Sequence, residues 1–115
     1  MITSRAVFRT SGERVTDFLR IAFALQDAAI EGPGTVRYEW FSGLVPHEFV
    51  VLEEYVDPAA ATNHNQDCAD LLQELSGVAE LLSVEFHGEL DESLTRWIDS
   101  EPSARSYPPL ERPGA

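Results

Sequence analysis

Lysine is absent from this 115-residue sequence, cysteine and methionine occur once each, and no apolar run approaches the length of a membrane span. The sequence contains eight arginines and 20 aspartates and glutamates, which gives a formal net charge of −12. This balance argues against nucleic acid or anionic membrane as a partner, because both are bound through clustered cations. The lone Cys68 cannot form an internal disulfide, and the first residues lack the apolar core of a signal peptide. We therefore expect a soluble, cytoplasmic protein that binds neither nucleic acid nor membrane.

The chain has the length of one domain with one modest core. Hydrophobic residues make up 43% of it, an ordinary share for a globular protein. Residues 100–115 differ in composition, because they contain four prolines and few side chains that a core could bury. We expect a folded domain over residues 1–99 and a Pro-rich tail over residues 100–115 that is either disordered or packed on a partner subunit.

Hydrophobic periodicity predicts four strands and two main helices. Alternation of apolar and polar residues marks strands over residues 2–9, 35–41, 49–56 and 81–87. Apolar residues at three- and four-residue spacing mark one helix that ends near Glu31 and another that starts at Asp57-Pro58, and a short helix is expected over residues 92–98. The order β-α-β-β-α-β predicts an α+β, ferredoxin-like fold, in which both helices cover one face of an antiparallel sheet.

The hairpin expected within residues 31–57 has one apolar and one charged face. Strict alternation directs four of its side chains toward the helices: Tyr38, Trp40, Leu52 and Glu54. The open face of the sheet is then expected to carry, among arginines and glutamates, the apolar residues Val7, Phe49, Val51 and Tyr55. A second copy of the chain would cover these residues and pair the charges. We expect a homodimer that packs sheet against sheet; the alternative is a monomer with a solvated sheet face.

Two stretches of this hairpin, E-G-P-G-T-V-R-Y-E-W-F and F-V-V-L-E-E-Y-V-D-P-A-A-A, are followed by His64. Over residues 2–90 the sequence resembles the antibiotic biosynthesis monooxygenase family of dimeric α+β barrel proteins. The resemblance implies a cofactor-independent monooxygenase that oxidises an aromatic polyketide-like, anthrone or quinol substrate with molecular oxygen. Because fold alone does not assign an activity, two alternatives stay open. One is a non-oxidative cyclase or isomerase of aromatic polyketide biosynthesis, and the other is a non-catalytic small-molecule binding or accessory protein.

An oxygenase of this kind needs a base, donors for the substrate anion and a wall for a flat ring. His64 is the candidate base, because imidazole titrates near neutrality and the helical stripe directs this side chain inward. The alternative is a buried histidine satisfied by a nearby carbonyl or carboxylate. Asn65 could donate to an oxyanion, or belong to a solvated helical turn. The rings of Tyr38 and Trp40 could stack on the substrate while the phenol and the indole N–H donate hydrogen bonds, or both could be ordinary core residues.

Six further residues are candidates for contact with the substrate: Phe18, Phe23, Leu52, Glu54, Cys68 and Phe86. Glu53 and Glu54 cannot share one site, because adjacent strand residues point to opposite faces. Glu54 is expected on the helix side, where its carboxylate could orient the His64 imidazole. The three histidines are far apart in sequence and fit no typical zinc site, and the ligand arrangement of haem-degrading relatives is not reproduced. We expect no metal, no haem and no other cofactor.

Overall fold

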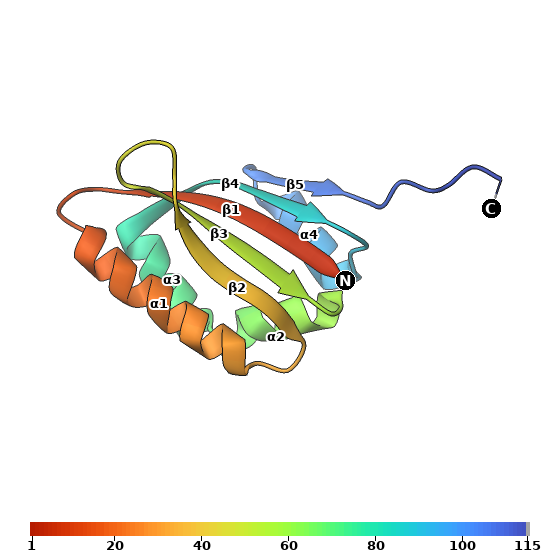
Figure 1. The fold of residues 1–115 in the computed structure, drawn as a ribbon, viewed down its shortest axis with the longest axis horizontal. Coiled ribbons are helices and arrows are strands. Elements are labelled where there is room, and N and C mark those ends of the chain that lie inside the picture. The colour runs from red at the N-terminus through yellow and green to blue at the C-terminus, as the bar shows by residue number, and fades with distance from the viewer. Residues whose placement is uncertain (115) are drawn as a thin grey trace.

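A mixed sheet of five strands carries the helices on one face (Figure 1). The computed structural model describes residues 1–114. Its elements in chain order are β1 (Ile2–Thr10), α1 (Val15–Glu31), β2 (Thr35–Ser42), β3 (Glu48–Tyr55), α2 (Pro58–Asp67), α3 (Ala69–Val78), β4 (Ala79–His87), α4 (Glu92–Ser100) and β5 (Ala104–Tyr107). The strands lie in the order β2-β3-β1-β4-β5, antiparallel except for β5, which runs parallel to β4. The predicted α+β, ferredoxin-like fold is confirmed, and the sheet of one chain is not closed.

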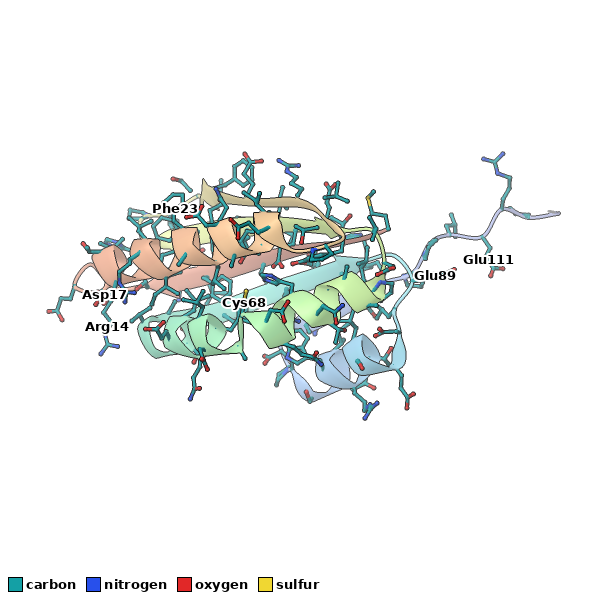
Figure 2. All side chains as sticks on the ribbon, turned by 90° about the horizontal axis from the view of Figure 1, so that it is seen from below. Arg14, Asp17, Phe23, Cys68, Glu89 and Glu111 are labelled. Carbon is teal, nitrogen blue, oxygen red and sulfur yellow. The ribbon has the colours of Figure 1, made fainter. Side chains whose placement is uncertain are left out.

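The core lies between the sheet and the helices. Every second residue at the start of β1 is buried toward the helices, namely Ile2, Ser4 and Ala6, as the two-residue period of a strand requires. From the other side, α1 buries Phe18 and Leu25 completely. Figure 2 shows α1, the α2–α3 pair and α4 arranged beside one another across this face. The helices α2, α3 and α4 therefore cover any cavity that lies against this face of the sheet.

The side-chain directions predicted for β3 are wrong. The observed pairing sets Tyr38 opposite Glu53 and Trp40 opposite Val51, and opposed residues share one face of a sheet. The β3 residues that point toward the helices are therefore Phe49, Val51, Glu53 and Tyr55, whereas Leu52 and Glu54 point to the open face. A shift of one residue inverts every side chain of a strand. Alternation could not decide whether the odd- or the even-numbered residues of β3 face the helices, which are the two possible phases of the strand. The run F-V-V-L at residues 49–52 places apolar residues on both faces in either phase.

The second predicted helix is two helices in the structure. The predicted start is confirmed, because the Asp57 carboxylate accepts a hydrogen bond of 2.9 Å from the Ala60 N–H. Cys68 interrupts the helix with φ −105° and ψ 18°, and separates α2 from α3. α2 then packs on β3 and α3 on β4. The residues on either side of the break consequently face different parts of the sheet.

The segment expected to be a tail contributes a strand to the sheet. Ala104 of β5 lies opposite Val84, and Tyr107 lies opposite His87, with their rings stacked at a centroid distance of 5.1 Å. Residues 108–114 extend away from the sheet (Figure 1), and Ala115 lies outside the described residues. The four-residue β5 is too short for alternation to reveal it. Across residues 1–114, every helix is too short or too polar to cross a membrane.

Candidate active site

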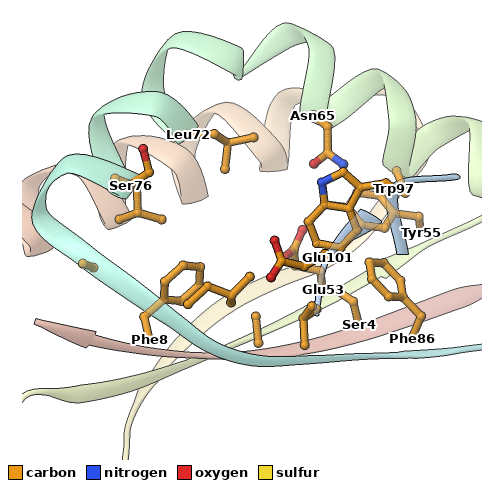
Figure 3. A pocket seen from close by; sticks show the side chains of 16 residues that line it. Ser4, Phe8, Glu53, Tyr55, Asn65, Leu72, Ser76, Phe86, Trp97 and Glu101 are labelled. Atoms are coloured by element: carbon orange, nitrogen blue, oxygen red, sulfur yellow. The ribbon is translucent and has the colours of Figure 1, made fainter. Parts of the chain in front are cut away.

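The main cavity has a volume of about 450 Å³ and lies between the sheet and α2, α3 and α4 (Figure 3). β1, β3 and β4 form its floor. Its wall is largely apolar and includes Phe8, Leu72, Phe86 and Trp97. Ligand pockets of small molecules have this size and this character, with a few polar groups that fix the orientation of the ligand. A small organic molecule therefore fits the cavity.

Glu53 is the centre of the polar groups on the cavity wall. Its Oε1 accepts a hydrogen bond of 2.5 Å from the Tyr55 hydroxyl, and both residues line the cavity because side chains two positions apart in a strand share a face. Ser4 of β1 lies directly opposite Glu53 in the sheet and also hydrogen-bonds to its carboxylate. Three side chains from two central strands thus converge at one point of the cavity.

Burial raises the pKa of the Glu53 carboxyl above its ordinary value of 4.5, although the hydrogen bonds from Tyr55 and Ser4 act in the opposite direction. Burial, and then the negative charge of Glu53, raises the pKa of Tyr55. The Tyr55 hydroxyl accordingly stays protonated and remains a donor. A carboxyl whose pKa is closer to neutrality can take up a proton from a ligand and return it, as general acid–base catalysis requires.

His64 points inward, as predicted, but its nearest carboxylate is Glu53 and not Glu54. Its Nε2 lies 3.9 Å from the Glu53 Oε1, and its Nδ1 lies 3.7 Å from the Cys68 Sγ. Burial lowers the pKa of His64 below its ordinary value of 6.5, against the opposing effect of the Asp67 charge. The imidazole is therefore neutral at pH 7, and the contact with Glu53 is not an ion pair.

His64 and Cys68 line a second, smaller cavity of about 90 Å³ rather than the main one. This cavity also touches the loop between α1 and β2 at Gly32 and Pro33. Burial raises the pKa of the Cys68 thiol, so the thiol stays protonated and is a poor nucleophile. His64 thus stands behind Glu53 as seen from the main cavity.

Tyr38 and Trp40 belong to an aromatic cluster beside His64 and do not line the main cavity. The rings of Tyr38 and His64 have a centroid distance of 5.2 Å, and Trp40 meets Phe18 edge to face at 5.4 Å. Burial raises the pKa of the Tyr38 hydroxyl, so it remains a phenol. The buried Trp40 N–H has no hydrogen-bond partner among residues 1–114. This arrangement matches the core alternative for both aromatics.

The remaining candidates from the sequence are divided among several places. Asn65 and Phe86 line the main cavity, and Phe18 is fully buried in the core. Phe23, Leu52 and Glu54, which were also expected to contact a substrate, do not line this cavity. Phe23 is 51% exposed on α1, and Figure 2 shows it there. Leu52 and Glu54 lie on the open face of β3, where the Glu54 carboxylate is 3.9 Å from Arg37.

Among the cavity residues that were not predicted from the sequence are Ser4, Glu53, Tyr55 and Trp97. A signal for Ser4 exists, because its hydroxyl stands between the apolar residues Ile2 and Ala6 on the buried face of β1. Glu53 and Tyr55 follow from the correct phase of β3. Trp97 lies one turn after the buried Leu94 of α4, but the sequence does not indicate where that helix docks.

The sequence of this chain matches one known protein family. A family model described as "Antibiotic biosynthesis monooxygenase" matches residues 1–69. No curated protein sequence matched significantly. Among solved structures, MupZ from Pseudomonas fluorescens is 19% identical, with a TM-score of 0.76 over 99% of this chain and 96% of MupZ. A putative antibiotic biosynthesis monooxygenase from Deinococcus radiodurans is 18% identical, with a TM-score of 0.70 over 80% of this chain and 94% of its own.

A third structure is a variant of SnoaB, described as a cofactor-independent oxygenase from Streptomyces nogalater. It is 15% identical, with a TM-score of 0.63 over 74% of this chain and 86% of SnoaB. At these identities the similarity shows a common fold. Within residues 1–114, no three histidine, cysteine or acidic side chains are grouped as ligands for a metal ion.

Proposed function

Because the chain belongs to the antibiotic biosynthesis monooxygenase family, we propose that it is an enzyme whose main cavity binds a small, largely apolar molecule and exchanges a proton with it. The observation that carries this proposal is the Glu53 carboxyl, which has a raised pKa and lines an apolar cavity beside the hydroxyls of Tyr55 and Ser4. Acid–base groups work best when their pKa is near the working pH. Glu53 takes the catalytic position expected from the sequence for His64.

The first candidate reaction is monooxygenation of an aromatic polyketide-like, anthrone or quinol substrate without a cofactor. Glu53 removes a proton from the substrate, Asn65 donates a hydrogen bond to the resulting anion, and the anion transfers electrons to molecular oxygen. One oxygen atom enters the product and the other leaves as water. His64 stands behind Glu53, and Tyr38, on which Trp40 packs, holds its ring in place. The structural similarity to SnoaB supports this reaction.

The second candidate is a non-oxidative cyclase or isomerase, and the charge of the cavity favours it. The two charged side chains that line the cavity, Glu53 and Glu101, are both acidic, and no arginine of residues 1–114 lines it. Carboxylates stabilise a positive charge that develops in a transition state, and they destabilise an anion. In this reaction a protonated Glu53 gives its proton to the substrate, and a nucleophile within the same molecule closes a ring or a bond migrates. The cationic intermediate then loses a proton to the Glu53 carboxylate, which restores the acid.

Oxygen dependence separates the two reactions. Purified, metal-stripped protein is incubated with anthrones and quinols while oxygen uptake is recorded, and the same incubations are repeated under strict anaerobiosis. A monooxygenase consumes one oxygen molecule per product and stops without oxygen, whereas a cyclase or isomerase turns over equally in both conditions. Turnover in either condition that survives Glu53→Gln unchanged would contradict the role proposed for this residue.

The open face of the sheet is the surface through which we propose that two copies of the chain associate. In the observed phase of β3, Val50 and Leu52 lie on this face, opposite Val7 and Arg5 of β1. We expect light scattering at micromolar concentration to give twice the monomer mass of 12.8 kDa. Leu52→Arg would place a second cation directly opposite Arg5 on this face and is expected to give monomers. A monomeric mass for the unaltered protein would refute the proposed dimer.

A further inference from the structure

We propose that the α4–β5 segment selects the substrate, and that Trp97 and Glu101 make the cavity accept uncharged or cationic molecules and reject carboxylates. The inference rests on the proposed function in one respect, because it takes the main cavity as the substrate site. Both residues lie beyond the part of the chain that the family model matches, residues 1–69. The selection is therefore a property of this chain's C-terminal part.

The α4–β5 segment is anchored at both ends. The Asp91 carboxylate accepts a hydrogen bond of 2.9 Å from the Leu94 N–H at the start of α4, and the Leu94 side chain is buried. After α4, the buried Ala104 pairs with Val84 in the sheet. Hydrogen bonds and burial at each end fix the position of α4 beside the cavity, so that α4 acts as a wall.

Trp97 provides the aromatic surface of this wall. Its indole lines the cavity and is 40% exposed, so the ring reaches from the cavity to the protein surface. It meets Phe86 of β4 nearly edge to face, with a centroid distance of 5.9 Å and an interplanar angle of 76°. Figure 3 shows Trp97, Asn65 and Tyr55 among the side chains of the cavity wall. A flat apolar ligand can stack on the indole.

Glu101 provides the charge of this wall. It lines the cavity at the C-terminal end of α4, where the helix dipole adds a partial negative charge. Its Oε1 accepts hydrogen bonds from Ser103, of 2.6 Å from the hydroxyl and 3.3 Å from the N–H, which hold the carboxylate in place. The nearby Arg105 donates to the backbone carbonyls of Pro102 and Ala104. The Glu101 charge is therefore not neutralised by this arginine.

Two acids and no lining arginine make the cavity electrostatically negative along its length. A ligand carboxylate would have to leave water and approach Glu53 and Glu101 without a cation to pair with, which costs free energy. An ammonium or a hydroxyl group at the α4 end would find an acceptor in Glu101. The chemistry that fits is an apolar ring system with a donor or a cation at one end.

Isothermal titration calorimetry with three probes of similar size tests the inference on the full chain at pH 7. The probes are 2-naphthol, 2-naphthoate and 2-naphthylmethylammonium. We expect the ammonium to bind at least about tenfold more tightly than the naphthoate, a ratio that one close unit charge supplies. Glu101→Gln keeps the acceptor for Ser103 and is expected to reduce the ratio by at least about threefold. Trp97→Ala is expected to weaken the binding of all three probes by about tenfold.

The control is Glu89→Gln, because Glu89 is exposed, does not line the cavity and carries the same charge. Naphthoate binding as tight as that of the ammonium, equal effects of the two glutamate variants, or no binding of any probe would each overturn the inference. The readout is binding, so it does not depend on which reaction the cavity catalyses. Failure of the proposed function would instead appear as turnover that survives Glu53→Gln while these binding ratios persist.

Discussion

Glu53→Gln is expected to lower kcat by about 10²- to 10⁴-fold, the usual contribution of a general acid or base. Glutamine has the shape of the carboxyl and can still accept the hydrogen bond from the Tyr55 hydroxyl, but it cannot take up or release a proton. Since the apolar wall of the cavity is unchanged, KM should change little. The measurement is steady-state kinetics on a substrate found in the oxygen-dependence screen, with circular dichroism to verify that the variant is folded.

The neighbouring residue supplies a matched control for this substitution. Glu54→Gln removes the same charge one position along β3, on the open face of the sheet, where the carboxylate lies near Arg37. Its kcat should stay within about twofold of the unaltered protein, as expected for a surface group outside the site. Equal losses in the two variants, or a larger loss in Glu54→Gln, would contradict the side-chain directions of β3 and the role of Glu53.

Phe18→Ala is expected to lower the free energy of unfolding by about 3 to 5 kcal/mol, as the loss of a large buried aromatic does. Phe18 is fully buried, and its ring stacks on Phe49 at 4.8 Å and meets Trp40 edge to face at 5.4 Å. Urea unfolding at a fixed protein concentration, with the m-value checked for constancy, measures the loss.

Phe23→Ala makes the same chemical change on the same helix at a 51% exposed position. Its effect should stay within about 0.5 kcal/mol, as for most surface substitutions. Similar losses for the two variants would show that Phe23 is covered, for example by another copy of the chain. If Phe18→Ala left stability unchanged and altered ligand binding, Phe18 would be a substrate-contact residue, as the sequence suggested, and not a core residue.

The architecture could be predicted because its signals are local and repeated. Residues 2–9 of β1 alternate, α1 shows a clear apolar stripe, and Asp57 followed by Pro58 marks a helix start. The phase of β3 could not be predicted, because residues 49–52 are apolar in both phases and the pairing with β2 decides between them. The sequence of β5 does not predict a strand, because its four residues are too few to show alternation. They form a strand by pairing with the edge of β4.

The candidate site was predicted in part for the same reasons. The inward direction of His64 and the cavity positions of Asn65 and Phe86 follow from helical and strand periodicity within single elements. The role of Glu53 depends on the pairing of β3 with its neighbours, which tertiary structure sets. Trp97 belongs to a helix that was predicted, but its place beside the cavity follows from the docking of α4 between α2 and β5.

The protonation of Glu53 is the most direct measure of whether this residue serves as the acid–base group, and it needs no substrate. Carbon-13 NMR of the glutamate carboxyls across pH 3 to about 9, with Glu53→Gln to assign the signal, gives its pKa in the folded protein. We expect a value above the ordinary 4.5, because burial outweighs the hydrogen bonds from Tyr55 and Ser4. Tyr55→Phe removes a bond that stabilises the carboxylate and should raise the pKa further. A Glu53 pKa at or below 4.5, unmoved by Tyr55→Phe, would contradict the central claim.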